Sequence, residues 1–214
     1  HADTVMKVDC HARTFTTIGA VPRGTWKWHG GQMGPDGNIY GIPSYADRVL
    51  KIVPATGEVT FIGGPLVGDA KWYGGLNGRD GAIYGIPYTA QSVLRIVPET
   101  GAVTTFGSLP AGGWKWHGGV VTPNGTIYGL PSHAEAVLKI VPGEHPEVSQ
   151  VGGPYRGKYQ WAGGVCGADG NVYGIPSDTD RVLRICPETD AAELVGPSLP
   201  GRNKWQGGVL APDG

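Results

Sequence analysis

The sequence predicts an all-β fold, a five-bladed β-propeller of four-stranded antiparallel blades, and three observations lead to it. A unit of about 44 residues recurs along the chain of 214 residues. Each unit holds short β-branched or aromatic runs bounded by glycine or proline, which is the pattern of short strands. The 38 glycines and 18 prolines fall at fixed places in the unit, so they mark turns. Four short antiparallel strands in each repeat of this length describe a propeller blade.

A Gly-Gly pair anchors the first expected strand of each unit. Successive pairs are separated by 44, 44, 45 and 44 residues. We expect these segments to be the inner strands, because five strands crowd around a narrow axis and glycine permits close backbone approach. The pairs begin at Gly30, Gly74, Gly118, Gly163 and Gly207.

Residues 28–63 illustrate the elements of one unit. Residues 28–33 and 38–43 are the first two expected strands, and Asp36-Gly37 between them predicts a two-residue hairpin with a type I′ turn. Residues 48–54 and 58–63 are the third and fourth strands, joined by a turn at residues 55–57. The same hairpin slot holds Asp80-Gly81, Asn124-Gly125, Asp169-Gly170 and Asp213-Gly214.

Four complete blades are expected within a single domain of residues 1–214, beginning near Trp28, Trp72, Trp116 and Trp161. Residues 1–24 supply a third and a fourth strand, and residues 204–214 supply a first strand. Together they predict a composite fifth blade, so that both termini close the ring and hide the sheet edges. The second strand of that blade has no counterpart, which leaves a slice of a six- or seven-bladed propeller as the alternative.

The unit resembles the blades of virginiamycin B lyase-like, NHL and gluconolactonase-type propellers. The resemblance rests on Pro-Asp-Gly-Asn-Ile-Tyr at residues 35–40 and on Val-Leu-Lys-Ile-Val-Pro-Ala-Thr-Gly at residues 49–57, and it covers the whole chain. It implies the propeller fold, but such blades serve lyases, lactonases and binding modules alike. Lactonase-type propellers gather carboxylates and an asparagine around an axial metal, and lyase-like propellers use a histidine and a glutamate. His117 and Glu135 would be that pair, although His29 duplicates the first.

A Lys-Trp pair precedes the inner strand in four of the five copies, and the remaining copy reads Gln160-Trp161. Indole rings can stack on a sugar face or hold a cation, while lysines fix hydroxyl groups. We expect ligand contacts here at each blade junction, with wedging of the tryptophans between blades as the alternative. The candidate ligand-binding residues are Trp26, Lys27, Trp28, His29, Lys71, Trp72, Tyr73, Trp114, Lys115, Trp116, His117, Trp161, Lys204 and Trp205.

A second recurrence is a basic residue in each third strand, preceded four positions earlier by an acidic or amide residue. In the unit described above these are Lys51 and Asp47. We expect each such pair to form an ion pair or a hydrogen bond between blades. The tyrosine of the second strand, Tyr40 in this unit, is expected to pack within the blade with its hydroxyl group bonded.

The leading functional hypothesis is a non-enzymatic, multivalent, lectin-like protein that binds glycans or other small polar ligands, as some five-bladed tachylectin-type propellers do. No catalytic residue, cofactor or metal site is expected, because the inner strands match one another and carry no Asp or Glu before the hairpin. One alternative is a structural or adhesive module that meets protein neighbours. The other is a lyase- or lactonase-type enzyme.

Composition excludes some partners and suggests a compartment. Only 16% of the residues are charged and the net charge is -1, which gives no basis for binding nucleic acid or an anionic membrane. No run is long and apolar enough for membrane insertion. The sequon Asn124-Gly125-Thr126 lies on an expected hairpin tip and favours an extracellular, secreted protein.

Overall fold

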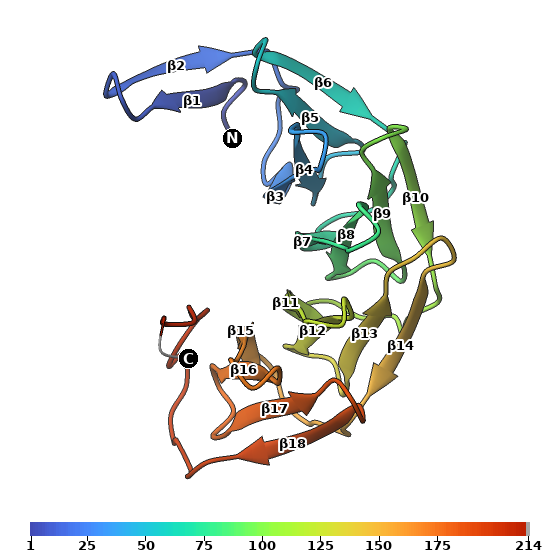
Figure 1. Cartoon of the computed structure of the whole chain (residues 1–214), viewed down its shortest axis with the longest axis vertical. Coiled ribbons are helices and arrows are strands. Elements are labelled where there is room, and N and C mark those ends of the chain that lie inside the picture. The colour runs from blue at the N-terminus through green and yellow to red at the C-terminus, as the bar shows by residue number, and fades with distance from the viewer. Residues whose placement is uncertain (213–214) are drawn as a thin grey trace.

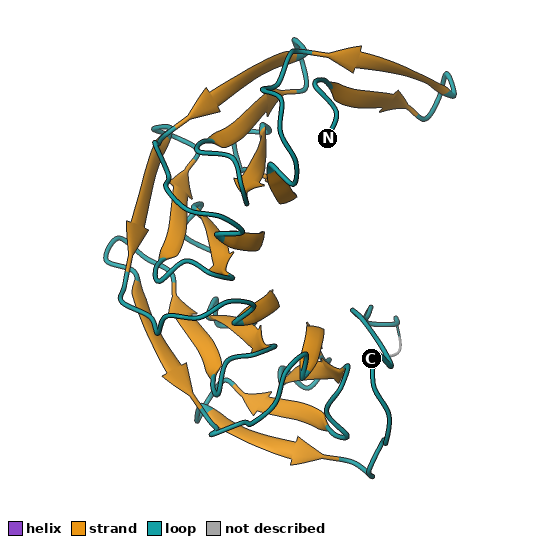
Figure 2. Cartoon of the chain, turned by 180° about the vertical axis from the view of Figure 1, so that it is seen from behind, coloured by secondary structure: helices purple, strands orange, loops and turns teal. Residues whose placement is uncertain are grey.

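The computed structural model describes residues 1–212, and this part of the chain contains strands and no helix. Four antiparallel four-stranded sheets follow one another along an arc, each with its first strand at the inner edge and its fourth at the outer edge (Figures 1 and 2). The predicted all-β propeller architecture is therefore confirmed. No helix that could cross a membrane is found among residues 1–212.

The strands fall where the repeat predicts them, and each sheet pairs them in chain order. The first full blade contains β3 (Trp28–Met33), β4 (Ile39–Pro43), β5 (Val49–Val53) and β6 (Glu58–Ile62). The second contains β7 (Trp72–Asn77), β8 (Ile83–Pro87), β9 (Val93–Val97) and β10 (Ala102–Phe106). The third contains β11 (Trp116–Val121), β12 (Ile127–Pro131), β13 (Val137–Val141) and β14 (Glu147–Val151). The fourth contains β15 (Trp161–Cys166), β16 (Val172–Pro176), β17 (Val182–Cys186) and β18 (Ala191–Val195).

The hairpin between the first two strands of each blade differs from the predicted type I′ turn. Gly37 has a positive φ of 75°, whereas Asp36 is not among the residues with positive φ. The Gly37 amide donates to the Gly34 carbonyl, and the Gly34 amide donates to Asn38. In this first blade Pro35 favours the turn, because its fixed negative φ suits the second position of a type I turn, which the glycine then closes in a left-handed conformation. The predicted turn at Asp213-Gly214 lies outside the described residues.

The Gly-Gly pairs have the close approach that the sequence predicts, and a second reason to be glycine. The first glycine of each pair has a positive φ, 74° at Gly30, and the strand register shifts between Trp28 and Gly31. This is a β-bulge at a left-handed residue, where a side chain would be strained. A Cβ on Gly30 would also lie 3.1 Å from the Cα of Gly74 in the next inner strand.

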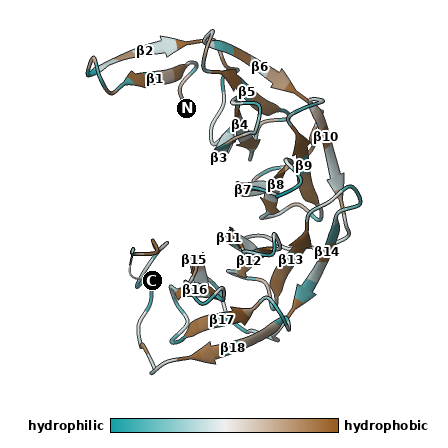
Figure 3. Cartoon of the chain, in the orientation of Figure 1, coloured by the Kyte–Doolittle hydropathy of each residue, from teal (hydrophilic) through white to brown (hydrophobic). Residues whose placement is uncertain are grey.

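Apolar side chains hold successive blades together. In Figure 3 the brown, hydrophobic residues concentrate in the second and third strands of the full blades. Three buried clusters fill the junctions between neighbouring full blades, and each includes a tryptophan from the start of an inner strand: Trp72, Trp116 and Trp161. Each indole therefore acts as a wedge between two blades, as the alternative interpretation of the sequence proposes.

The structure does not show the predicted closure of the ring. At one end, β1 (Val5–Asp9) and β2 (Thr14–Ile18) form a sheet of two strands. Residues 204–210, expected as the innermost strand of that blade, are not paired with β1 or β2. They lie beside β15, where the Gly207 amide donates to the Ala162 carbonyl at 2.7 Å. The arc stays open between these two ends (Figure 1).

Candidate functional site

The lysines of the Lys-Trp pairs point into the junctions between blades. Lys115 is only 4% exposed, and its Nζ donates to the carbonyl oxygens of Ala90 at 2.9 Å, Gly112 at 3.1 Å and Tyr88 at 3.4 Å. Two of these acceptors belong to the preceding blade. Burial lowers the pKa of Lys115 to about 8, so the group is still an ammonium ion at neutral pH. We call this arrangement the lysine clasp, because a cation and backbone carbonyls join two blades.

The same clasp recurs in the other copies. Lys71, which is 2% exposed, donates to the carbonyls of Ser44 and Gly68, both at 2.8 Å. Lys204 reaches the carbonyls of Ser177, Thr179 and Gly201, and Lys27 reaches those of Ala2 and Pro22. In the fourth copy, the neutral Gln160 keeps two of the bonds, to Ser132 and Ala134.

The tryptophans that follow the lysines are also engaged by the fold. Trp72, Trp116 and Trp161 are buried, and each donates its Nε1 proton to a carbonyl oxygen in its own blade; for Trp116 the acceptor is Ala136 at 2.8 Å. Trp28 makes the same bond to Arg48, and Trp205 is about half exposed. A ligand-binding role for these lysines and tryptophans stays a prediction, whereas their contacts to the protein are visible.

The residue that follows each tryptophan lies at the inner edge of the arc and faces its counterpart in the next blade. His29, Tyr73 and His117 occupy this position in the first three full blades. The imidazole of His29 stacks on the phenol of Tyr73 with ring centroids 3.5 Å apart, and Tyr73 meets His117 at 4.3 Å. We call these three residues the inner stack. The sequence named all three as candidates, and the structure brings them together.

Both imidazoles of the inner stack are kept neutral. Burial lowers the pKa of His29 below its ordinary value, and burial together with the nearby His29 lowers the pKa of His117. Burial also raises the pKa of Tyr73, so the phenol keeps its proton. The Nδ1 atom of His29 is buried without a hydrogen-bond partner among the described residues. A neutral imidazole has one ring nitrogen with a lone pair, which can take a proton from a bound molecule.

The residue before each lysine lies at the opposite flank of the pair. Trp26 is 65% exposed and Trp114 is 45% exposed. Trp114 contacts Tyr88 and His133, which the sequence analysis did not single out. The sequence does distinguish Tyr88, because the other full blades have serine at its position: Ser44, Ser132 and Ser177.

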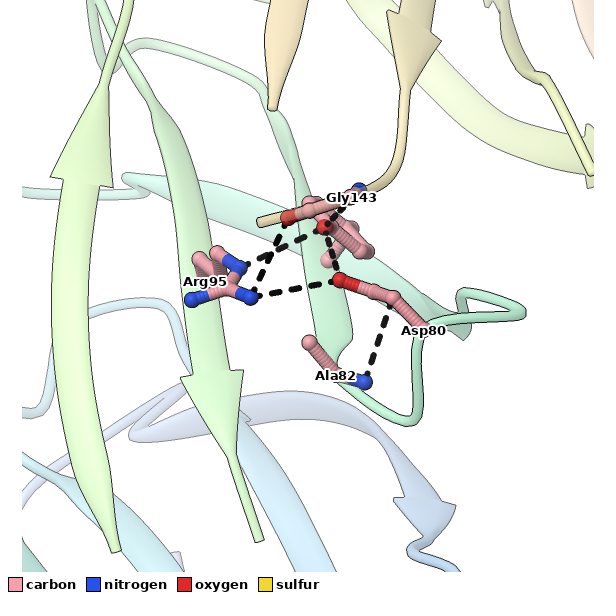
Figure 4. A network of polar contacts seen from close by, with 5 residues as sticks. Asp80, Ala82, Arg95 and Gly143 are labelled. Atoms are coloured by element: carbon pink, nitrogen blue, oxygen red, sulfur yellow. Dashed lines mark hydrogen bonds and ion pairs between the residues drawn. The ribbon is translucent and has the colours of Figure 1, made fainter. Parts of the chain in front are cut away.

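At the hairpin end of the blades, the hydroxyl groups of the second-strand tyrosines are hydrogen-bonded, as predicted, and their acceptors are carboxylates. Figure 4 shows one such network in the second blade. The Tyr84 hydroxyl donates to Asp80 at 2.7 Å, and Arg95 donates to Asp80 at 3.2 Å and to the Gly143 carbonyl of the next blade at 3.3 Å. The hairpin aspartate thus fixes the tyrosine and the third-strand base of its own blade.

These contacts correct the expected pairing of the third-strand bases. The sequence suggested partners four positions earlier, such as Asp47 for Lys51, but the ion pairs of the described residues join Arg95 to Asp80, Lys139 to Asp190 and Arg184 to Glu193. Residues four positions apart here span a bend and the start of a strand, so their side chains do not meet. The third blade has Asn124 in the hairpin slot, and Asp190 of the next blade supplies the carboxylate to Tyr128 and Lys139 instead.

The described residues do not provide the side-chain ligands that would hold an axial metal, as in lactonase-type propellers. Residues 1–212 contain no group of three or more His, Cys, Asp or Glu side chains that could hold a metal ion. Glu135, the suggested partner of His117, is exposed. Among the side-chain clusters described above, the inner stack is therefore the best candidate for a site of proton transfer.

No family model matches the chain, and no curated protein matches it. Among solved structures, it is similar to virginiamycin B lyase from Staphylococcus aureus, with a TM-score of 0.73 and 16% identity over 91% of this chain and 63% of that one. A catalytically inactive variant of that lyase with Quinupristin, in which a histidine is replaced by alanine, gives 0.74 and 16% over 94% and 65%. A candidate 6-phosphogluconolactonase from Bacteroides uniformis gives 0.63 and 16% over 94% and 65%.

These similarities establish the propeller fold, and the chain spans less than two thirds of the length of each of these structures. They also contradict the leading hypothesis of a non-enzymatic, lectin-like protein, because the similar structures with a named activity are enzymes. That hypothesis gave more weight to the repetition of the Lys-Trp pair than to the differences between its neighbours.

Proposed function

We propose that this chain is part of a lyase-type propeller enzyme in which the inner stack binds the substrate and transfers a proton. The observation that carries the proposal is the meeting of two neutral imidazoles, His29 and His117, on either side of Tyr73. The inactive variant of the similar lyase lacks one histidine, which supports a histidine-dependent reaction. A lactonase-type reaction that depends on an axial metal has less support, because the carboxylate donors are missing from the described residues.

His117 is the better candidate for the base. In the next inner strand its counterpart is Ala162, which has no ring to cover the imidazole as Tyr73 does on the other side. In an elimination, the neutral imidazole would take a proton from a carbon next to a carbonyl group. The electrons of that C–H bond form a C=C bond while the C–O bond to the leaving oxygen breaks. The imidazolium then returns the proton to that oxygen.

Tyr73 and His29 would position this base. Tyr73 packs against both imidazoles and keeps its proton, so its hydroxyl group is available to donate a hydrogen bond to a carbonyl oxygen on which charge develops. His29 covers the other face of Tyr73 and restricts the ring. We expect replacement of His29 to have a smaller effect than replacement of His117.

The test is incubation of the purified protein with quinupristin and with a panel of lactones, followed by mass spectrometry. Elimination in a cyclic substrate opens the ring without changing its mass, whereas hydrolysis adds the mass of one water. We expect a ring-opened product of unchanged mass, and a loss of about 10²- to 10⁴-fold in rate for His117→Ala. His145→Ala, in an exposed turn, is the matched control. Full activity of His117→Ala, or no product from any substrate, would contradict the proposal.

A further inference from the structure

A row of residues in left-handed backbone conformation runs along the blades, directly before the lysine clasp. Positive φ is uncommon for residues other than glycine and persists where the surrounding structure enforces it. Here it recurs in every copy with unlike side chains. The row consists of Trp26 (49°), Ala70 (47°), Trp114 (60°), Tyr159 (52°) and Asn203 (49°).

Hydrogen bonds from the same blade hold this conformation. The carbonyl oxygen of Trp114 accepts the amide of His133 at 2.9 Å, and that of Tyr159 accepts the amide of Asp178 at 2.9 Å. The next carbonyl, that of Lys115, accepts the amides of Ser132 and Ala134. The backbone is thus fixed by bonds that do not depend on the side chain of the row residue, which is free to vary.

In the third and fourth blades this row builds a corner of aromatic rings. The Trp114 indole lies nearly parallel to the His133 imidazole, with an interplanar angle of 14° and centroids 5.7 Å apart. Tyr159 stands perpendicular to both, at 90° to Trp114 and 82° to His133. Tyr88 supports Trp114 from the preceding blade, with ring centroids 5.3 Å apart. Despite these contacts, Trp114 is 45% exposed and Tyr159 is 41% exposed.

This corner suits a planar aromatic ring. Aromatic pairs prefer offset-stacked or edge-to-face arrangements, and the corner offers a flat floor and a perpendicular wall at once. Its rings are already held by one another, so little side-chain freedom would be lost on binding. The other exposed tryptophan of the row, Trp26, also lines a cavity, of about 320 Å³, but it has no perpendicular pair of rings, since its ring partner among the described residues is His1 at 6.0 Å.

The corner adjoins the inner stack and a cavity. Tyr88 also stacks on Tyr73 at 5.0 Å, so the corner is continuous with the inner stack. Tyr159 also lines a cavity of about 540 Å³, which is in the size class of small-molecule sites. That cavity is also lined by Lys158, Asp178, Arg202 and Asn203, which are polar.

We propose that Trp114, His133 and Tyr159 form a subsite for an uncharged aromatic ring of a small molecule whose polar remainder lies in the cavity beyond Tyr159. The link of this subsite to a substrate rests on the proposed function, because the inner stack is its neighbour. The binding itself does not depend on turnover, so the two can be tested separately.

The probe is N-acetylphenylalanine amide, compared with N-acetylcyclohexylalanine amide, which has the same polar tail and a saturated ring. Binding is measured by titration calorimetry or ligand-observed NMR. We expect weak binding of the aromatic probe, about fivefold weaker binding of the saturated one, and about fivefold weaker binding of the aromatic probe to Trp114→Asn and Tyr159→Asn. Asparagine is chosen because Asn203 holds the same conformation in this chain.

Trp26→Asn is the matched control, since it removes an exposed tryptophan from the same backbone conformation without touching the corner. Equal binding of the two probes, an equal loss in Trp26→Asn, or unchanged binding in Trp114→Asn and Tyr159→Asn would overturn the proposal. Melting curves verify that each variant is folded, and Tyr159→Phe, which keeps the wall, should retain binding. His117→Ala should bind the probe normally, so absence of turnover with intact probe binding would count against the proposed function alone.

Discussion

The lysine clasp and the residues that flank it differ in what they contact, although both positions recur in every repeat. Lys71 and Lys115 are almost fully buried, and their ammonium groups donate hydrogen bonds to backbone carbonyls of the neighbouring blade. One residue before the clasp, and two residues after it, the side chains vary and meet their counterparts from other blades, as Tyr73 meets His29 and His117. The constant positions hold the blades together, and the variable positions carry the chemical differences.

The physical reason lies in what each position contacts. A clasp faces backbone carbonyls, which are the same in every blade, so one side chain serves all junctions. A flanking residue faces another side chain, and a change in either alters the pair. Recurrence in a repeat protein therefore indicates packing, and departures from recurrence indicate sites.

The largest effect should follow from breaking a clasp. Lys115→Met removes the ammonium and its bonds to the carbonyls of Ala90 and Gly112, whereas the Tyr88 carbonyl keeps its bond from the backbone amide of residue 115. We expect the free energy of unfolding to fall by about 3 kcal/mol in urea titrations. Lys158→Met, at an exposed position, should change it little. If Lys115→Met leaves the free energy of unfolding unchanged, the clasp does not stabilise the fold, and the ligand-binding role predicted from the sequence is favoured instead.

A smaller loss of stability is expected where the carboxylate that bonds the second-strand tyrosine comes from the next blade. Asp190→Asn, which tolerates the positive φ of 59° at this position, removes the carboxylate that accepts the Tyr128 hydroxyl and pairs with Lys139. Asp190 is partly exposed, so we expect a loss of about 1 kcal/mol. Adding Asn124→Asp, which restores the hairpin aspartate of the other full blades, should recover most of it. A double variant as unstable as the single one would show that the two positions are not equivalent.

The inner stack should make stability depend on pH. The pKa values of His29 and His117 lie below the ordinary value of 6.5, so the folded protein binds fewer protons than the unfolded chain below that pH. Their contribution is complete above pH 6.5 and is lost as the pH falls through the folded-state pKa values. Melting temperatures measured at decreasing pH should fall less steeply for the His29→Ala, His117→Ala double variant. An identical pH dependence in both proteins would contradict the burial of neutral imidazoles.

The smallest effect tests the one clasp that lacks a charge. Gln160→Lys would add an ammonium that can reach the Gly157 carbonyl, the counterpart of Gly112, as well as those of Ser132 and Ala134. We expect a gain of about 0.5–1 kcal/mol in the free energy of unfolding. Gln160→Met should lose stability and serves as the control. A destabilising Gln160→Lys would mean that this junction is shaped for an amide.

The sequence by itself determined the all-β class, the 44-residue unit, the strand bounds and the glycines of the inner strands, because these depend on local chemistry: strand-forming runs, turn residues and backbone room. It also contained the members of the inner stack. Tertiary structure alone decided that Lys115 is buried among carbonyls, that Asp190 serves the blade before it, that the row from Trp26 to Asn203 is left-handed, and that the arc stays open. The burial of Lys115, the role of Asp190 and the open arc depend on the distance and rotation between two blades, which no single repeat encodes. The left-handed row depends on hydrogen bonds between residues of one blade that are distant in the sequence.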